Sequence, residues 1–514
     1  MSKKGSTRRN FLRSIGLGSA ALFTVPQISF TNPKKIKIKN RKPNIVYIMA
    51  DDLGKEWISC YGAEGIKTPE IDKLANSGIK FENFYCMPQC SPTRLSLLTG
   101  QYPYHHGWVN HWDVPLWGGG CHFDPGVFPS IGNVLKSAGY KTVVAGKWQI
   151  DDLRVEPEAC RTAGFDEYCM WTGPEGGNRK ISRDRYWNPY IHTKEGSKTY
   201  QGKFGPDIFT DFLLNFMKKN KDDPMFIYFS MCLPHRPMTT TPIKTNVSTN
   251  EEKYIAMVEY IDHLTGRIVK MLDQLNIREN TIIIWTTDNG GAPSQFGIRN
   301  GIKVRGGKTR TVEQGINVPF IVNCPGMVPQ GVVSDALTDV TDILPTCAEL
   351  AGAELPITYK NDGLSIADVI LGESKDSKRE WIMAMGGKNN AKMTDAGPEN
   401  EWYWRDRVIR NKRYKLYVGP DKESKKLIDL EKDPWEKSNI INSKDPYIKS
   451  VLKKLHDVVH QFPQKDNDFV FRPNPEQPWD VKIEAKSEVW KKGRPVKKQI
   501  KKVSEFHKKL LRSK

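Results

Sequence analysis

Buried strands that alternate with helices are the feature that most constrains this fold. Residues 44–50 read NIVYIMA, a continuous apolar run that is typical of a strand covered on both faces. Residues 225–230 and 281–287 form similar runs, and helical segments at 206–219 and 251–275 precede them. This alternation predicts an α/β fold in which helices cover both faces of a large, mostly parallel sheet.

The same pattern defines the domain organisation. We expect further helices at 69–77, 129–138 and 339–351, and further strands at 79–85, 141–145 and 318–323. After about residue 370 the pattern changes to extended, aromatic-rich pieces at 401–418 and 426–430 and a helix at 446–459, which predicts a smaller C-terminal subdomain built on an antiparallel sheet. The predicted units are a signal and basic linker at 1–42, a main domain at 43–370, the subdomain at 371–480 and a basic tail at 481–514.

The net charge of +19 is confined to the two ends of the chain. Residues 1–42 carry 11 lysines and arginines and no acid, and residues 481–514 carry 13 basic and 3 acidic residues. The part between them, 43–480, has 54 basic and 56 acidic residues, so the folded body is nearly neutral. A nucleic-acid-binding domain carries its own basic face, so we do not expect nucleic acid as a partner.

The N-terminus reads as an export signal. Arg8 and Arg9 are followed by Phe11-Leu12 and by an apolar stretch at about 15–30, a pattern that resembles the bacterial twin-arginine signal. The alternative is an ordinary basic arm. Cys60 is the first cysteine, so no lipid-accepting cysteine follows the apolar stretch, and no other segment reaches 18 apolar residues. We therefore expect export by the twin-arginine machinery to the periplasm, or secretion, without a membrane anchor.

Acidic side chains follow two of the predicted strands. Asp51 and Asp52 come directly after the strand at 44–50, and Asp288 and Asn289 follow the strand at 281–287. Ligands of open α/β sheets bind beyond the carboxyl ends of the strands. An all-oxygen set suits a hard cation, so the four residues predict a site for Ca²⁺ or Mg²⁺. The plainer interpretation of each acidic pair is a turn.

A cysteine at the start of a helix is the second candidate for chemistry. Cys90-Ser91-Pro92-Thr93-Arg94 is followed by Leu-Ser-Leu-Leu-Thr-Gly at 95–100. Pro92 favours a helix start, where the positive end of the helix stabilises anions, and Arg94 can neutralise an anion there. The nine cysteines form no Cys-x-x-Cys pair, which argues against a zinc ribbon. The plainer interpretation is a small buried cysteine.

The run Cys-x-Pro-x-Arg followed by Leu-x-x-Leu-Thr-Gly resembles the signature of the formylglycine-dependent type I sulfatases of the alkaline phosphatase superfamily. The resemblance extends over about 43–370, and 401–441 is similar to that family's C-terminal subdomain. It implies that a separate maturation enzyme oxidises Cys90 to formylglycine, whose hydrated form is the nucleophile that attacks sulfur.

Residue roles follow from the resemblance by position. It implies that the metal, Ca²⁺ or Mg²⁺, is held by Asp51, Asp52, Asp288, Asn289 and modified Cys90. Arg94 resembles the residue that steadies the formylglycine. Lys147 and Lys308 resemble the two lysines that bind sulfate, with Lys303 as a competitor for the second role, and His235 resembles the histidine that protonates the leaving oxygen.

One position departs from the family pattern. The family usually has a histidine two residues after the first lysine, and this sequence has Gln149 there. Glutamine can orient a hydroxyl by hydrogen bonding but cannot act as a base. Either another group supplies the base, for which His105, His106 and His122 are candidates, or turnover is slow.

The substrate is less constrained by the sequence. Half of the tryptophans lie between residues 57 and 187, two of them in the glycine-rich stretch 112–120, and their rings can either stack on sugars or pack the loops. Arg183, Arg185 and Arg236 are candidates for contacts with further anionic groups. We expect a sulfated polysaccharide or oligosaccharide as substrate, ahead of a small aryl or alkyl sulfate. The alternatives are a phosphodiesterase or phosphonate monoesterase on the same fold and a weakly catalytic glycan-binding relative.

Overall fold

The computed structural model describes residues 41–109, 123–151, 153, 156–171, 185–356, 359–386, 391–394, 397–400 and 403–468. The predicted basic tail at 481–514 lies outside these residues, as does the predicted signal except for Arg41 and Lys42.

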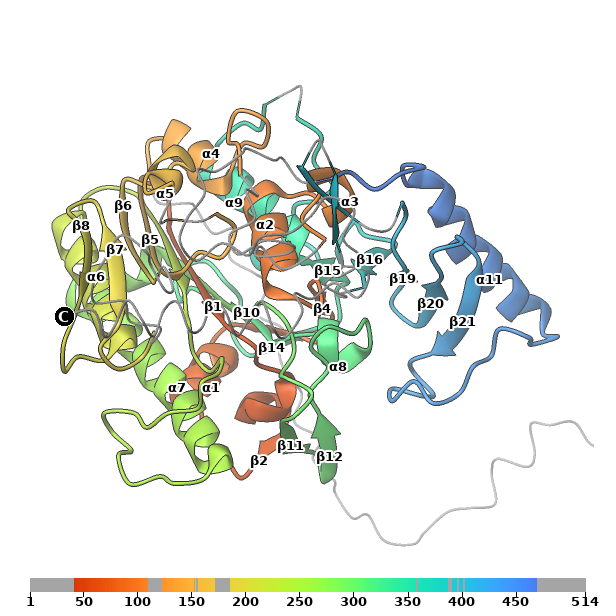
Figure 1. Cartoon of the computed structure of the whole chain (residues 1–514), viewed down its shortest axis with the longest axis horizontal. Helices are drawn as coiled ribbons and strands as arrows, with labels where there is room; N and C mark the ends of the chain where they lie inside the picture. Colours follow the sequence, from red (N-terminus) through yellow and green to blue (C-terminus); the bar gives the residue numbers. More distant parts are fainter. Residues whose placement is uncertain are drawn as a thin grey trace, which may run out of the picture. The chain divides into compact units, whose positions relative to one another are not determined.

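A sheet of ten strands forms the centre of the main domain (Figure 1). Its five central strands run parallel in the order β10 (Thr281–Thr287), β1 (Asn44–Ala50), β9 (Met225–Ser230), β5 (Lys141–Lys147) and β6 (Glu167–Trp171). On one side the sheet continues with β13 (Phe320–Asn323), β3 (Ile79–Phe81) and β14 (Val332–Ser334), and on the other with β7 (Tyr190–Thr193) and β8 (Gly196–Thr199). Antiparallel pairs occur only toward the two sides of this sheet, so the prediction of a large, mostly parallel sheet is confirmed.

Helices cover both faces of the sheet because neighbouring residues of its strands point to opposite sides. Tyr47 and Met49 of β1 pack in a core with α2 (Cys90–Thr99), α4 (Ile131–Ser137) and α9 (Ile343–Ala351). Val46 and Ile48 pack in a second core with α1 (Pro69–Asn76), α6 (Gly205–Lys219) and α7 (Asn250–Gln274). The two groups of helices lie on opposite sides of the sheet in Figure 1. β1 is therefore buried along its whole length, as its continuous apolar run predicts.

The differences from the expected bounds are local. The expected strand at 79–85 is interrupted, with β3 followed by β4 (Phe84–Tyr85), which pairs with β15 (Thr338–Asp339). The expected helix at 339–351 begins with a 3₁₀ turn at Val340–Asp342, because Asp339 caps that turn through its carboxylate. The remaining short elements are α3 (Pro103–His106), α5 (Ala159–Thr162), α8 (Glu313–Ile316), α10 (Ala367–Ile370) and a small sheet of β2 (Ala63–Glu64), β11 (Phe296–Arg299) and β12 (Ile302–Arg305).

A four-stranded antiparallel sheet follows the main domain, as predicted. Its strands are β16 (Ile382–Met385), β19 (Arg407–Arg410), β20 (Tyr414–Val418) and β21 (Ser424–Asp429), and α11 (Pro446–Asp457) packs on it (Figure 1). β17 (Ala391–Thr394) and β18 (Gly397–Asn400) form a separate pair. The core of this sheet also includes Tyr85, Tyr102 and Ile316, so the sheet is fastened to the main domain by shared apolar contacts. Within the described ranges, no helix is both long and apolar enough to cross a membrane.

Candidate active site

The carboxyl ends of β1 and β10 bring the predicted acidic residues together. The two strands pair in parallel through Ala50 and Thr287, so the residues that follow them emerge side by side. The backbone N–H of Asp52 donates to Asp288 Oδ1 at 3.1 Å, and Asn289 Nδ2 donates to Asp52 Oδ1 at 2.8 Å. All of these polar side chains are buried, and Asp52 has a φ of 65°, a strained conformation that is concentrated at functional sites.

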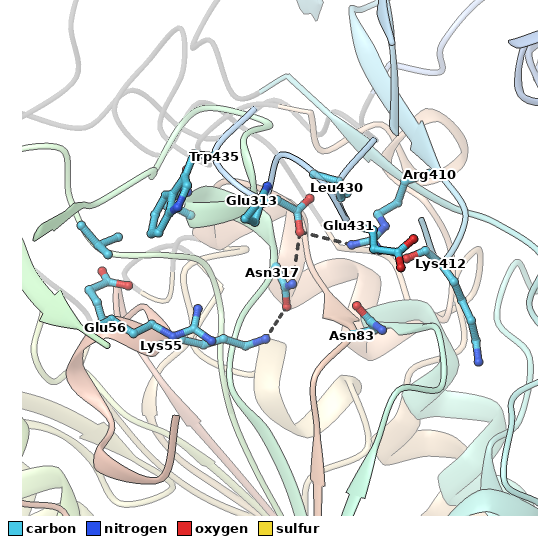
Figure 2. Close-up of a pocket in the computed structure, with 14 residues that line it drawn as sticks. Lys55, Glu56, Asn83, Glu313, Asn317, Arg410, Lys412, Leu430, Glu431 and Trp435 are labelled. Carbon is cyan, nitrogen blue, oxygen red and sulfur yellow. Dashed lines mark hydrogen bonds and ion pairs between the residues drawn. The ribbon is translucent and has the colours of Figure 1, made fainter. Parts of the chain in front are cut away.

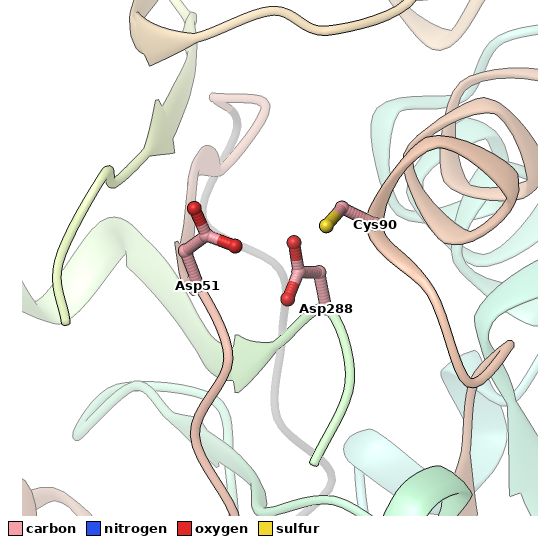
Figure 3. A group of neighbouring side chains, drawn as sticks. All are labelled: Asp51, Cys90 and Asp288. Carbon is pink, nitrogen blue, oxygen red and sulfur yellow. The ribbon is translucent and has the colours of Figure 1, made fainter. Parts of the chain in front are cut away.

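Cys90 faces these carboxylates from the first residue of α2 (Figure 3). Its Sγ and carboxylate oxygens of Asp51 and Asp288 all lie within 4.8 Å of one another. Helix α2 is buried throughout, and burial raises the pKa of Cys90 to about 11. The unmodified side chain is therefore a protonated thiol at neutral pH, which makes it a weak nucleophile.

Two buried cations, one from helix α2 and one from strand β5, contact the carboxylates. Arg94 donates from Nη2 to Asp288 Oδ2 at 2.6 Å and lies 3.8 Å from Asp51 Oδ1. Lys147, the last residue of β5, donates to Asp51 Oδ2 at 2.7 Å. Although burial opposes its ionisation, Lys147 and neighbouring cations hold the pKa of Asp51 well below its usual range.

Lys308 approaches the same centre from the loop that follows β12. Its Nζ lies 2.5 and 2.7 Å from the two carboxylate oxygens of Asp52 and 3.4 Å from Cys90 Sγ. Lys303, the competing residue, is exposed on β12 and lies over the ring of Phe296 at 5.1 Å. The structure thus places Lys308, and not Lys303, against Asp52 and Cys90.

The oxygen atoms of this cluster fit a hard divalent cation. Within the described part of the chain, Asp51 Oδ1 and Asn289 Oδ1 are buried acceptors that have no hydrogen-bond partner. Burial and the neighbouring Asp51 carboxylate raise the pKa of Asp288 to about 6, which shows repulsion between these two acids. A cation held by Asp51, Asp52, Asp288 and Asn289 would satisfy the unpaired oxygens and offset the repulsion.

His235 borders the acidic cluster on the side open to solvent. Its Nε2 lies 3.6 Å from Asp52 Oδ2, and its Nδ1 lies 3.1 Å from Arg185 Nη1 and 2.8 Å from the backbone oxygen of Arg236. Arg185 is itself held by stacking on the Trp171 ring at 3.9 Å. Burial lowers the pKa of His235 to about 3, so the imidazole is neutral at neutral pH.

Gln149 lies beside the start of α2. Its backbone oxygen accepts a hydrogen bond from Ser91 Oγ at 2.9 Å, next to Cys90 in the chain. Its φ of 61° is the left-handed conformation that a residue other than glycine rarely adopts. The residue that departs from the family pattern is therefore fixed next to the candidate nucleophile.

His105 and His106, two of the histidines that could replace the base missing at Gln149, have other partners. His105 Nδ1 lies 2.7 Å from Asp362 Oδ2. His106 is fully buried, with Nε2 3.1 Å from Ser96 Oγ, and burial holds its pKa well below its usual range. His122, Arg183 and the tryptophan-containing segment 112–120 lie outside the described residues.

Ser230 is a member of this site that the sequence analysis did not identify. It ends β9, between β1 and β5, and its hydroxyl accepts from Arg94 Nη1 and donates to the backbone oxygen of Lys147 at 2.6 Å. A polar residue at the end of a continuous apolar strand is the same signal that identified Asp51, and it could have pointed to Ser230.

A buried ion-pair cluster connects the loop of Lys308 to the C-terminal sheet (Figure 2). Glu313, at the start of α8, accepts from Asn317 Nδ2 at 3.1 Å and from Arg410 Nη1 at 3.2 Å. Lys415 lies 3.0 Å from Glu313 Oε1 and 2.7 Å from Glu436 Oε1. These contacts line or border a cavity of about 370 Å³ at the junction of the two sheets. Four residues separate Glu313 from Lys308 in the chain, so the C-terminal sheet helps to position the lysine loop.

The chain is similar to known proteins along most of its length. A family model described as Sulfatase matches residues 43–353, and one described as N-sulphoglucosamine sulphohydrolase, C-terminal, matches residues 307–465. The chain is 28% identical over 493 residues to an N-acetylgalactosamine-6-O-sulfatase of Bacteroides thetaiotaomicron, covering 82% of this chain and 93% of the relative. It is also 28% identical over 459 residues to an ulvan-active sulfatase of Formosa agariphila, covering 83% of each chain. The crystal structure of Ps i-CgsB in complex with k-i-k-neocarrahexaose superposes with a TM-score of 0.69 at 25% identity, covering 84% of this chain and 95% of that one.

Proposed function

This chain belongs to the sulfatase family and is a sulfuric ester hydrolase, and we propose that it removes sulfate from a sulfated polysaccharide or oligosaccharide through formylglycine made from Cys90. The observation that carries the proposal is the convergence of Cys90 Sγ, the carboxylates of Asp51 and Asp288 and the ammonium group of Lys308 at one buried point.

Modification of Cys90 would explain why a protonated thiol, which is a weak nucleophile, lies where the reaction needs a nucleophile. A thiol with a pKa of about 11 is protonated at neutral pH. Oxidation by a maturation enzyme would supply a hydrated aldehyde, whose hydroxyl is an oxygen nucleophile. The start of α2 and the nearby Lys308 would stabilise negative charge at this oxygen.

The cations of the site would bind the sulfate group and support residue 90. Arg94, Lys147 and Lys308 converge on the carboxylate cluster, and we assign the two lysines to the sulfate oxygens and Arg94 to the support of residue 90. Ca²⁺, or Mg²⁺ in its place, held by Asp51, Asp52, Asp288 and Asn289 together with modified Cys90, would supply Lewis-acid polarisation of a sulfate oxygen. Gln149 would orient a hydroxyl group near Cys90 by hydrogen bonding.

His235 would act at the oxygen that leaves with the sugar. Its Nδ1 lies within hydrogen-bond distance of both the Arg185 guanidinium, which donates, and the Arg236 backbone oxygen, which accepts. We propose the tautomer in which Nδ1 accepts from Arg185 and the ring proton lies on Nε2, the atom that faces Asp52. Because burial keeps the His235 ring neutral, its Nε2–H would donate a hydrogen bond to the leaving oxygen and stabilise the charge that develops there.

Sulfate release from defined substrates tests this function. The protein is produced together with a formylglycine-generating enzyme and incubated with 4-nitrophenyl sulfate, with an aryl phosphonate and with oligosaccharides of ulvan, carrageenan and chondroitin 6-sulfate, classes chosen because the relatives act on or bind glycans of these kinds. We expect sulfate release from one glycan class, faster than phosphonate hydrolysis. Faster phosphonate hydrolysis would favour the phosphonate monoesterase alternative, and tight glycan binding without release would favour the weakly catalytic alternative that Gln149 suggests.

We further propose that the protein is exported by the twin-arginine machinery and acts in the periplasm or outside the cell. The support is the Arg8-Arg9 pattern at 6–12 and the bacterial origin of the two relatives. Replacing both arginines by lysine, with cell fractionation as the measurement, should leave the protein in the cytoplasm. Unchanged fractionation would contradict this route.

A further inference from the structure

A second cavity, of about 710 Å³, lies beside the active site on the side of His235. Three of its lining residues are close in the chain to site residues: Arg236 follows His235 directly, Trp57 comes five residues after Asp52, and Ser294 comes five residues after Asn289. Tyr254, which also lines the cavity, donates from its hydroxyl to the backbone oxygen of Asp52 at 3.2 Å. The cavity is therefore joined to the catalytic centre by the segments that form both.

The charge of the cavity suits an anionic ligand. Arg236 and Lys303 line it, and Glu251 is the acidic residue among its lining groups. Arg236 is held in place by a hydrogen bond from Nη2 to Ser294 Oγ at 3.0 Å. Arg305, on the same hairpin as Lys303, lies 5.8 Å from the Phe296 ring and adds a further positive charge.

The wall of the cavity also offers apolar surface. Phe296 and Ile298 of β11 are 44% and 46% exposed, and because alternate residues of a strand point to the same side, the two side chains lie on one face of the strand. Trp57, which is 5% exposed, also lines the cavity.

We propose that this cavity is a subsite for a neighbouring sugar unit of an anionic glycan chain, next to the unit whose sulfate is removed. The proposal rests on the proposed function for its substrate class. The guanidinium of Arg236 and the ammonium of Lys303 bind a sulfate or carboxylate group, and Phe296 and Ile298 pack against the C–H face of a sugar ring. The volume of about 710 Å³ lies within the range of about 300–1,000 Å³ that small-molecule sites span.

Binding measured without turnover tests the subsite. In a Cys90→Ala background, calorimetry compares the affinity for hexasaccharides of ulvan, carrageenan and chondroitin 6-sulfate before and after Lys303→Glu. We expect Lys303→Glu to weaken binding of the best hexasaccharide about tenfold or more at low salt, with a smaller effect at high salt. Phe296→Ala should weaken it without this salt dependence.

A matched control comes from Lys198 on β8, which is exposed and lies over the Tyr200 ring at 4.9 Å, much as Lys303 lies over Phe296. Lys198→Glu should leave the affinity unchanged. Equal effects of the two lysine variants, no effect of either, or no binding of any hexasaccharide would overturn the subsite. A change of sedimentation coefficient in Lys303→Glu would assign the cavity to a contact between copies of the chain and would also overturn it.

Failure of the subsite and failure of the proposed function are separable. If the matured wild-type protein hydrolyses 4-nitrophenyl sulfate but Lys303→Glu does not change the affinity for any hexasaccharide, the subsite is wrong and the sulfatase mechanism is retained. If Lys303→Glu weakens hexasaccharide binding but the matured protein releases sulfate from no substrate, the mechanism is wrong and the subsite is retained.

Discussion

At the scale of single residues, we expect Gln149 to set how the reaction depends on pH. Its backbone oxygen accepts from Ser91 Oγ, next to Cys90 in the chain, and its side chain cannot accept a proton. We expect Gln149→His to raise kcat about tenfold or more when release of sulfate limits turnover, because a positioned base contributes about 10²–10⁴-fold. The kcat profile of the variant should gain a limb near pH 6.5 that is missing from wild type. An identical pH profile for both proteins would show that residue 149 does not take part in proton transfer.

His106 provides a second prediction at this scale, for stability. Burial holds its pKa well below 6.5, so the folded protein keeps it neutral while the unfolded chain protonates it below about pH 6.5. The stability that it contributes is therefore present above pH 6.5 and is lost as the pH falls. In wild type this adds up to about 1.4 kcal/mol per pH unit to the loss of unfolding free energy below pH 6.5. Urea unfolding of His106→Gln should show a shallower dependence between pH 6.5 and 5, and parallel curves would contradict the assignment.

At the scale of elements, the C-terminal sheet supports the lysine loop through a buried ion-pair cluster. Lys415→Met leaves the carboxylates of Glu313 and Glu436 without their shared partner and should lower the free energy of unfolding by about 3–5 kcal/mol. The displaced loop should also raise KM for sulfate esters. The matched control is Lys412→Met, which removes half-exposed ion pairs to Asp335 and Asp376 and should cost less than about 1 kcal/mol. Equal losses in urea unfolding would contradict this account.

The elements also show what the sequence could and could not predict. Asp51 and Asp288 were predictable as neighbours because both follow apolar runs, and parallel strands end at one edge of the sheet. Family motifs supplied Cys90, Arg94, Lys147, His235 and Lys308, and the structure brings all five to that edge. Ser230 and the stacking of Arg185 on Trp171 were not predicted, because such contacts depend on strand order and loop paths that no local pattern contains.

At the scale of the whole molecule, a divalent cation would couple the active site to global stability. The acids that would hold it follow two central strands, so binding to the folded state alone stabilises the whole main domain. We expect EDTA to lower the melting temperature and abolish sulfate release. Ca²⁺ at about 100 times its Kd should restore about 2.7 kcal/mol, and Mg²⁺ serves as the comparison. Asp288→Asn should reduce the rise in melting temperature that Ca²⁺ causes. A melting temperature that neither EDTA nor Ca²⁺ changes would contradict the metal site.

The most direct test of the central claim is the mass of the tryptic peptide that spans residues 81–94, taken from protein that has been co-produced with a formylglycine-generating enzyme and that releases sulfate. We expect residue 90 to be present as the aldehyde, with –CHO in place of –CH₂SH, and we expect Cys90→Ala to release no sulfate. A peptide that retains the thiol at Cys90, from a preparation with full activity, would contradict catalysis through formylglycine.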